Sequence, residues 1–318
     1  MLSYNQFKNL VLESFKNYLP EKYQNCELEQ TENKKVNCIL EGFCVKIPDS
    51  NVAPTIYFDD LYMNYMECKD IHQVLRSAAN TIEESLENLP MIDVKDFYKN
   101  TDDIILQLMN TKQNEKILSQ IPHREFQDLS IVYKKLIDNE TIGKGTALIT
   151  NELMSCMNLN EEELFQLASQ NTPQLMPFKI YSSNELIKDL LTQEGFSQEE
   201  IEEYTQDIPC DMWVLTNTEK FYGSSVLLYP DELQKVASKV NDNLYIIPSS
   251  IHDIIAVSAS LNEPDNLAEI VAMVNGTEVN LEERLSNQVY YFDRESKSLS
   301  LATDVENTRL DDYEEERE

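Results

Sequence analysis

The sequence has few of the residues on which nucleotide-binding sites depend. It has only six glycines in 318 residues, so loops that let the backbone close on a phosphate group are scarce. The one Gly-Lys pair, Gly143-Lys144, is followed by Gly145 instead of serine or threonine, and Asp138 occupies the position of the first glycine of a phosphate-binding loop. The glycine-rich dinucleotide fingerprint is also missing. The sequence therefore predicts no nucleotide cofactor.

Histidine and closely paired cysteine are scarce as well, which argues against a metal centre. The three histidines, His72, His123 and His252, are far apart, and none belongs to a His-Glu-x-x-His pair. No two cysteines have the two-residue spacing of a zinc knuckle or a redox dithiol. The cysteines are Cys26, Cys38, Cys44, Cys68, Cys156 and Cys210. Four of them within residues 26–68 leave a metal hypothesis open, but their spacing matches no common ligand pattern.

We therefore expect no cofactor and no metal. A magnesium site made of carboxylates alone stays open, because 57 acidic residues offer many accidental pairs. The thiols are expected to be reduced and mostly buried as small apolar groups, with Cys156 in the core because no basic residue stands beside it.

Basic residues are outnumbered by more than two to one. The chain has 57 Asp and Glu against 26 Lys and Arg, a formal net charge of −31, and no basic cluster offsets it. Direct nucleic-acid binding is not expected, because it relies on Lys and Arg to neutralise phosphates. The acidity is concentrated in residues 189–219, which hold nine acidic residues and no Lys or Arg. This segment is interpreted as a solvated acidic helix or connector, or as part of a decoy that binds a basic protein.

Long apolar runs are absent too. No stretch approaches membrane-spanning length, and the N-terminal MLSYNQFKNL has neither the basic start nor the apolar run of a signal peptide. Hydrophobic residues nevertheless make up 42% of the chain and aromatic residues 9%, which is typical of a folded protein. We expect a soluble, cytoplasmic protein that makes no membrane contact.

Residues 1–98 are predicted to form an N-terminal α+β subdomain. Ser3 and Gln6 have the spacing of a capping box at the start of an amphipathic helix. Residues 26–47 contain two strand-like runs separated by a polar turn, which predicts a hairpin. Residues 54–86 begin extended and then place apolar side chains at helical spacing.

Residues 99–302 are predicted to form a C-terminal α+β subdomain, and residues 303–318 an acidic disordered tail. A helix capped by Asn160 is expected to end at Asn171-Thr172-Pro173. Strands with short loops and single interspersed helices favour antiparallel sheets flanked by helices, so the fold class is α+β. The expected strands are residues 104–109, the second half of 120–137, 146–150, 212–217, 224–229 after Gly223, 244–248, 254–259 and a hairpin within 288–302.

Seven motifs are spread over almost the whole chain. They are YLPEKY, APTIYFDDLYMNY, NEKILSQIPHREFQDLSIVYKKLI, LFQLASQNTPQLMPFKI, MWVLTNTEKFYGSSVLLYPDELQKVA, LYIIPSSIHDIIAV and LSNQVYYFD. In this order they resemble a family of uncharacterised bacterial proteins, found mostly in clostridia, that is catalogued as a domain of unknown function. The resemblance covers residues 1–300. It implies one continuous architecture and a cytoplasmic location, and it supplies no catalytic residue, cofactor or partner.

One segment, NLYIIPSSIHDIIAV (residues 243–257), contains the ingredients of an acyl-transfer triad. Ser250 and His252 would share one face of an extended strand, while Asp253 would point to the other and could not easily orient the histidine. No G-x-S-x-G elbow surrounds Ser249 or Ser250. The other interpretation is a Pro-Ser-Ser turn between two strands, whose hydroxyls bond to the local backbone.

No catalytic residue is assigned from the sequence, and Ser249, Ser250 and His252 are the candidates if an activity exists. The favoured hypothesis is a binding or regulatory module that acts through contacts with an unknown protein partner and is not an enzyme. Two alternatives are a serine hydrolase that uses Ser249 or Ser250 with His252, and an acidic decoy that mimics nucleic acid and binds a basic protein.

Overall fold

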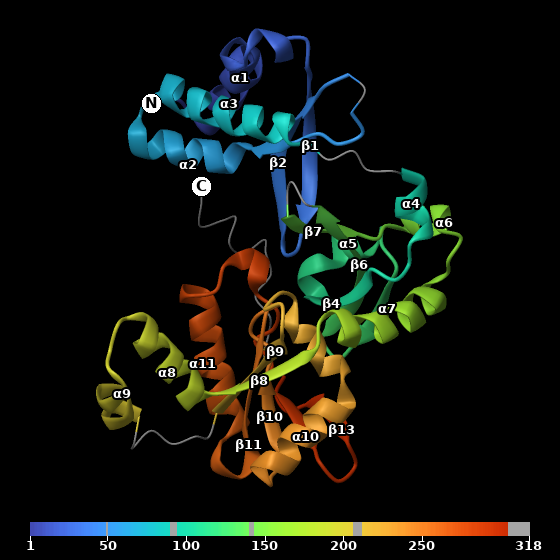
Figure 1. Cartoon of the computed structure of the whole chain (residues 1–318), viewed down its shortest axis with the longest axis vertical. Helices are drawn as coiled ribbons and strands as arrows, with labels where there is room; N and C mark the ends of the chain where they lie inside the picture. The colour runs from blue at the N-terminus through green and yellow to red at the C-terminus, as the bar shows by residue number, and fades with distance from the viewer. Residues whose placement is uncertain (49, 90–93, 140–142, 206–211, 305–318) are drawn as a thin grey trace. The chain divides into compact units, whose positions relative to one another are not determined.

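Two units of unequal size make up the chain in a computed structural model that describes residues 1–48, 50–89, 94–139, 143–205 and 212–304 (Figure 1). The first unit is Met1–Asn100 with Ile137–Gly145, and the second is Thr101–Leu136 with Thr146–Glu318. The sequence-based division into residues 1–98 and 99–302 stays a prediction. Residues 305–318 of the predicted tail lie outside the described residues.

The first unit combines a three-stranded antiparallel sheet with helices. Ser3 and Gln6 form the predicted capping box of the first helix, and the predicted hairpin is present as β1 and β2. Phe7, Phe43 and Leu75 belong to one buried apolar cluster that joins the sheet to the helices. The elements are α1 (Tyr4–Ser14), η1 (Phe15–Tyr18), η2 (Glu21–Tyr23), β1 (Glu27–Lys35), β2 (Cys38–Lys46), β3 (Thr55–Tyr57), α2 (Phe58–Cys68), α3 (Ile71–Glu87) and α4 (Val94–Lys99).

The second unit contains two antiparallel sheets. One has the order β4-β6-β5, with β7 also paired to β6, and the other has the order β13-β12-β10-β11-β9-β8. The elements as far as β8 are β4 (Ile104–Asn110), η3 (Lys112–Asn114), α5 (Glu115–Leu118), β5 (His123–Phe126), β6 (Leu129–Asn139), β7 (Gly143–Leu148), α6 (Asn151–Cys156), α7 (Glu161–Leu175) and β8 (Phe178–Ser182). After β8 follow α8 (Ser183–Gln193), α9 (Gln198–Thr205), β9 (Met212–Asn217), η4 (Gly223–Leu228), α10 (Pro230–Val240), β10 (Leu244–Ile247), β11 (Ile254–Ser258), η5 (Ala259–Leu261), α11 (Pro264–Thr277), η6 (Leu281–Glu283), β12 (Tyr290–Asp293) and β13 (Ser298–Leu301). The predicted α+β class with largely antiparallel sheets is confirmed.

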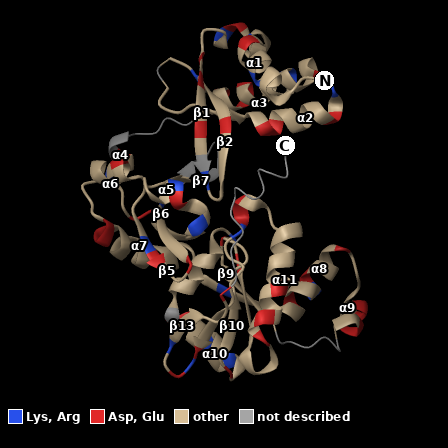
Figure 2. Ribbon diagram, turned by 180° about the vertical axis from the view of Figure 1, so that it is seen from behind, with Lys and Arg blue, Asp and Glu red and all other residues tan. Residues whose placement is uncertain are grey.

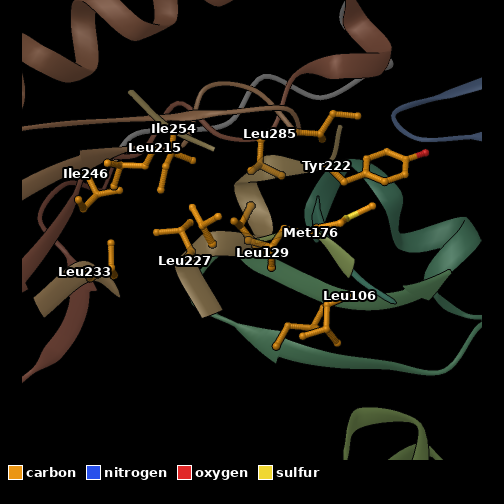
Figure 3. Close-up of a cluster of buried hydrophobic side chains, with 14 of the residues drawn as sticks. Leu106, Leu129, Met176, Leu215, Tyr222, Leu227, Leu233, Ile246, Ile254 and Leu285 are labelled. Carbon is orange, nitrogen blue, oxygen red and sulfur yellow. The ribbon is translucent and has the colours of Figure 1, made fainter. Parts of the chain in front are cut away.

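One core of buried apolar side chains fills the second unit and connects its two sheets (Figure 3). Leu106 and Leu129 come from the smaller sheet, Leu215 and Ile246 from the larger one, and Leu227 of η4 lies among them. Because side chains alternate along a strand, the neighbours of Ile246 on β10 face the other side of the larger sheet. That side is covered by α11 through a second buried cluster, whose members are Ile247, Ala268, Val271 and Val289.

Helix α7 runs along the open edge of β4, and its side chains form hydrogen bonds with free backbone groups of that strand. The Leu106 N–H donates to Thr172 Oγ1 at 2.9 Å, and Asn171 Nδ2 donates to the Ile104 carbonyl at 3.2 Å. These contacts protect an edge strand from pairing with another chain. The sequence placed the end of this helix at Asn171-Thr172-Pro173, which is wrong, because the helix continues to Leu175 with Pro173 inside it.

The strand expected at residues 224–229 is also wrong. This segment is the 3-10 helix η4, in which Ser224, Ser225 and Val226 are fully buried. A short apolar run that is buried on every side shows no alternation, so its sequence does not distinguish a strand from a short helix. Its start is fixed by Ser224, whose backbone N–H and hydroxyl both donate to the Ile251 carbonyl.

The cysteines differ from expectation in their burial. Of the five in the described part of the chain, all free, only Cys26 is buried. Cys68 and Cys156 are exposed, so the expected core position of Cys156 is wrong. Cys156 is the last residue of the short helix α6, whose described side chains are all at least partly exposed. Cys210 lies outside the described residues. Of the helices that the structure describes, none combines the length and the apolarity that crossing a bilayer requires.

Candidate functional site

The segment that contains Ser249 and Ser250 is extended and lies beside residues 283–286. The Leu285 N–H donates to the Ser249 carbonyl, and the Ile251 N–H donates to the Glu283 carbonyl, each at 2.9 Å. Ser250 forms an isolated antiparallel bridge with Arg284. The chain therefore bends at Ile251 and His252, just after the predicted Pro-Ser-Ser turn. Ser250 Oγ accepts a hydrogen bond from the His252 N–H at 3.0 Å, so this hydroxyl bonds to the local backbone, as one of the two interpretations predicted.

The imidazole of His252 is enclosed by aromatic rings and one carboxylate. Its ring is parallel to that of Tyr222, with an interplanar angle of 4° and 6.1 Å between centroids, and the centroid of Phe221 lies 6.0 Å away. His252 Nε2 lies 3.7 Å from Glu283 Oε1. His252 Nδ1 is buried and has no hydrogen-bond partner among the residues that the structure describes. The side chain as a whole is 28% exposed, so a ligand can reach the ring.

Tyr222 extends this cluster toward β6 and β7. Lys134 Nζ donates to Tyr222 Oη at 2.5 Å and lies 4.3 Å from the ring centroid, which combines a hydrogen bond with a cation–π contact. Thr146 Oγ1 lies 3.3 Å from the same hydroxyl. Tyr222 has a φ of +50°, a left-handed conformation that a bulky residue adopts only when its surroundings impose it. We call Lys134, Thr146, Tyr222, His252 and Glu283 the His252 cluster.

The loop that holds Tyr222 is organised by Asn217 at the end of β9. Asn217 Nδ2 donates to the Phe221 carbonyl at 2.8 Å, and its Oδ1 accepts from the Glu219 N–H at 3.0 Å. Gly223 then brings the loop against the His252 carbonyl, which also accepts from Thr216 Oγ1 at 2.9 Å. A Cβ at position 223 would lie 2.2 Å from that carbonyl oxygen, so only glycine allows this approach.

The cluster does not have the geometry of a serine triad. In the described part of the chain, no hydrogen bond joins Ser249 or Ser250 to the imidazole. The carboxylate of Glu283 approaches Nε2, the nitrogen that a triad histidine turns toward its serine. Asp253 is partly buried, and this burial raises the pKa of its carboxyl despite the opposing effect of His252. No described hydrogen bond connects Asp253 to His252 either.

The described side chains around His252 are not arranged as a metal site. Among the described residues, no group of three or more His, Cys, Asp and Glu side chains is arranged to hold a metal ion. The three histidines are on separate elements, where His72 contacts Tyr18 and His123 Nδ1 lies near the Ile121 carbonyl. The His252 cluster therefore offers one lysine, two hydroxyls, one imidazole and one carboxylate for contacts with a ligand.

A second candidate surface is the hairpin of α8 and α9. Each helix begins with a serine and a glutamate three residues later, and hydrogen bonds from Ser182 and Ser197 lower the pKa of Glu185 and Glu200. Gly195, at φ +87°, allows the chain to turn between the helices. Residues 183–205 hold seven acidic residues and one lysine. In Figure 2 the ribbon of α9 is marked in red at its acidic residues.

The same hairpin exposes large apolar side chains. Leu190 is 58% exposed, Phe196 39% and Tyr204 62%. The rings of Phe196 and Tyr204 meet edge to face, with 5.8 Å between centroids and an interplanar angle of 87°. The inner side of α9 is different, because Ile201 and Thr205 are buried. We call Leu190, Phe196, Tyr204 and the acidic residues around them the acidic hairpin surface.

Comparison with known proteins gives one match. The family model described as a family of unknown function, DUF5688, matches residues 4–294. The chain belongs to DUF5688. No curated protein and no solved structure shows a significant match to it. The range that this DUF5688 protein shares with its family includes the whole His252 cluster and the acidic hairpin surface. The match also confirms the resemblance to a family of unknown function that the seven motifs indicated.

The sequence indicates His252 and the aromatic Tyr222 of this DUF5688 protein separately, and does not predict that they meet or that Lys134 and Glu283 join them. Lys134 and Tyr222 are 88 residues apart and Glu283 is 31 residues beyond His252, so no local pattern joins them. The run NTEKFYG, which contains Tyr222, belongs to one of the seven motifs. The single glycine of this run, between an aromatic pair and two serines, is the local sign that another backbone segment approaches closely here.

Proposed function

We propose that this DUF5688 protein is a binding module whose acidic hairpin surface binds a basic, amphipathic segment of a partner protein. The observation that carries the proposal is the exposure of Leu190, Phe196 and Tyr204 within a hairpin that has seven acidic residues and one lysine. Exposed apolar groups rimmed by charge are typical of interaction surfaces. The acidic rim selects a cationic partner and accelerates its approach.

The aromatic pair supplies the anchor of the proposed interface. Tyrosine and other large aromatic residues are enriched among the side chains that dominate binding energy, because they bury much area at little conformational cost. Phe196 and Tyr204 already hold each other in place, so little ordering is needed when a partner covers them. A segment that alternates Lys or Arg with apolar residues at helical spacing would satisfy both the aromatic pair and the acidic rim.

We further propose that this role is performed in the bacterial cytoplasm. The free thiols of Cys26, Cys38, Cys44, Cys68 and Cys156 support a reducing compartment. The likeness of the motifs to mostly clostridial proteins supports a bacterial source.

The two alternatives receive less support. A polyanion decoy uses the acidic residues of the hairpin but gives Phe196 and Tyr204 no role, although both are exposed. A serine hydrolase needs a hydroxyl bonded to an imidazole, and Ser250 Oγ instead accepts from the His252 backbone. Neither alternative accounts for an aromatic pair at the centre of an acidic surface.

The test uses the full-length chain and a labelled peptide in which Leu and Lys repeat at helical spacing. A control peptide has the same composition in an order that removes the apolar face. Fluorescence anisotropy should show about tenfold tighter binding of the amphipathic peptide. The double variant Phe196→Ser/Tyr204→Ser should lose this preference, whereas Met63→Ser, at an equally exposed apolar residue of α2, should keep it.

A further variant distinguishes loss of the binding surface from loss of the hairpin structure itself. Leu190→Asn leaves the contact between Phe196 and Tyr204 intact and should weaken the amphipathic peptide alone. Equal affinity of the two peptides for the wild-type chain would contradict the proposal and would favour the decoy, because charge alone would then explain binding.

A further inference from the structure

A groove in the first unit separates helices α2 and α3. The two helices are joined by only two residues and so form an antiparallel hairpin, visible side by side in Figure 1. The groove has a volume of about 480 Å³ and is closed at one side by β3. Its floor is apolar and includes Leu61, Val74 and Ala78, of which the first two are buried.

The two walls of the groove are polar. On α2 the wall consists of Asp60, Asn64 and Glu67, which succeed one another at helical spacing and so share one face. The facing wall on α3 consists of Gln73, Ser77 and Thr81. Among the residues that the structure describes, no Lys or Arg lines the groove, and the charged side chains in its lining are the carboxylates of Asp60 and Glu67.

Neither carboxylate has a bonded partner among the described side chains. Among the described residues, Asp60 and Glu67 make no side-chain hydrogen bond and no ion pair. Their neighbours in the sequence behave differently. Asp59 accepts a hydrogen bond from Tyr4 Oη at 2.7 Å, and Asp70 caps α3 by accepting from the backbone of His72 and Gln73. The acids that face the groove are thus available to a ligand, whereas the acids beside them are structural.

The spacing of the two carboxylates indicates the shape of the ligand. Asp60 and Glu67 are seven residues apart on α2, so their backbone positions are separated by about 10 Å along the helix axis. Among the described residues, neither carboxylate belongs to a group of three or more His, Cys, Asp and Glu side chains that could hold a metal ion. The separation of about 10 Å corresponds to about nine covalent bonds of an extended chain, because three extended residues contain nine backbone bonds and span about the same length.

We infer that the groove binds a linear polyamine with about nine bonds between its terminal ammonium groups, such as spermidine. One terminal ammonium lies against Asp60 and the other against Glu67. The methylene groups between them lie on the apolar floor formed by Leu61, Val74 and Ala78. The central amine reaches the amide oxygen of Asn64 or the hydroxyl of Ser77, both of which line the groove.

The test is calorimetric titration of the full chain with spermidine, 1,8-diaminooctane and 1,4-diaminobutane. The first two ligands span both carboxylates and should bind about tenfold more tightly than the short diamine, which reaches only one. The double variant Asp60→Asn/Glu67→Gln should weaken spermidine by about tenfold. The charge-matched control Glu21→Gln/Glu84→Gln, at exposed positions of the same unit outside the groove, should change it less than about twofold.

A second pair of variants leaves the charge unchanged. Ala78→Trp places a bulky ring over the floor of the groove and should abolish the preference for the long ligands, whereas Asn80→Trp, at an exposed residue of the same helix, should retain it. Equal weakening by both charge variants, or equal affinity for the long and the short diamines, would overturn the inference. Either result would mean that polyamines bind only as counterions to a chain of net charge −31.

Discussion

Replacement of Gly223 by alanine is the most direct perturbation of the loop that holds the His252 cluster. A Cβ at this position would meet the His252 carbonyl oxygen and Thr216 Oγ1, each at 2.2 Å. The first of these atoms is backbone between η4 and β11 and cannot rotate away. The second already donates to the same carbonyl at 2.9 Å, so the added methyl would also break this hydrogen bond.

The expected cost follows from these two effects. Inserting a methyl group into a closely packed site costs about 1 to 3 kcal/mol. Loss of the hydrogen bond between Thr216 Oγ1 and the His252 carbonyl adds about 1 kcal/mol. We therefore expect Gly223→Ala to lower the free energy of unfolding by about 2 to 4 kcal/mol.

Urea unfolding followed by tryptophan fluorescence measures this effect in the correct unit. Trp213, the only tryptophan, is buried on β9, the strand that leads into the loop. The control is Gly276→Ala near the end of α11, where a Cβ meets no atom within 4 Å, and we expect it to stabilise by about 0.5 kcal/mol. A Gly223→Ala midpoint equal to that of the wild-type chain would refute the described packing of the loop.

Two further perturbations address ion pairs and pH. The guanidinium of Arg124 makes a bidentate contact with Glu161, at 3.1 and 2.8 Å, and stacks on Phe165. Arg124→Lys keeps the charge but loses this geometry, so we expect it to lower the free energy of unfolding by about 1 kcal/mol in the same urea assay. A wild-type midpoint would show that charge alone suffices. Hydrogen bonds from Ser258 and Ser260 lower the pKa of Asp242 from 3.8 to about 2, so its stabilisation is complete above about pH 4 and is lost as the pH falls toward 2. Asp242→Asn should therefore cost about 1 kcal/mol at pH 7 and progressively less below pH 4, and a cost independent of pH would contradict this assignment.

Much of the larger sheet was predictable because its strands alternate or form continuous apolar runs between clear turns. The strands at residues 244–248 and 254–259 are present as β10 and β11, and the hairpin within 288–302 as β12 and β13. These elements carry their own local signals. The failure at η4 has the opposite cause, because its conformation is imposed by the carbonyl of Ile251, 27 residues beyond Ser224, as well as by close packing with the preceding strand β9.

The candidate sites show the same contrast. The acidity of residues 189–219 was visible in the sequence, but the exposure of Phe196 and Tyr204 was not, because an aromatic residue in a helical segment is equally compatible with a core position. The sequence makes His252 a candidate because Ser250 is two residues away, but in the structure its ring lies beside Tyr222 and Glu283. Local sequence thus indicates which segments hold candidate site residues, but it does not indicate which side chains meet in the fold.

The central claim is that aromatic contacts and charge act together on the acidic hairpin surface, and the salt dependence of peptide binding tests it most directly. At high salt the range of charge interactions shrinks to about 3 Å, so any remaining affinity depends on Phe196 and Tyr204. The account predicts that the amphipathic peptide still binds the wild-type chain under these conditions and no longer binds Phe196→Ser/Tyr204→Ser. Complete loss of wild-type binding at high salt, or equal residual binding by the double variant, would contradict it.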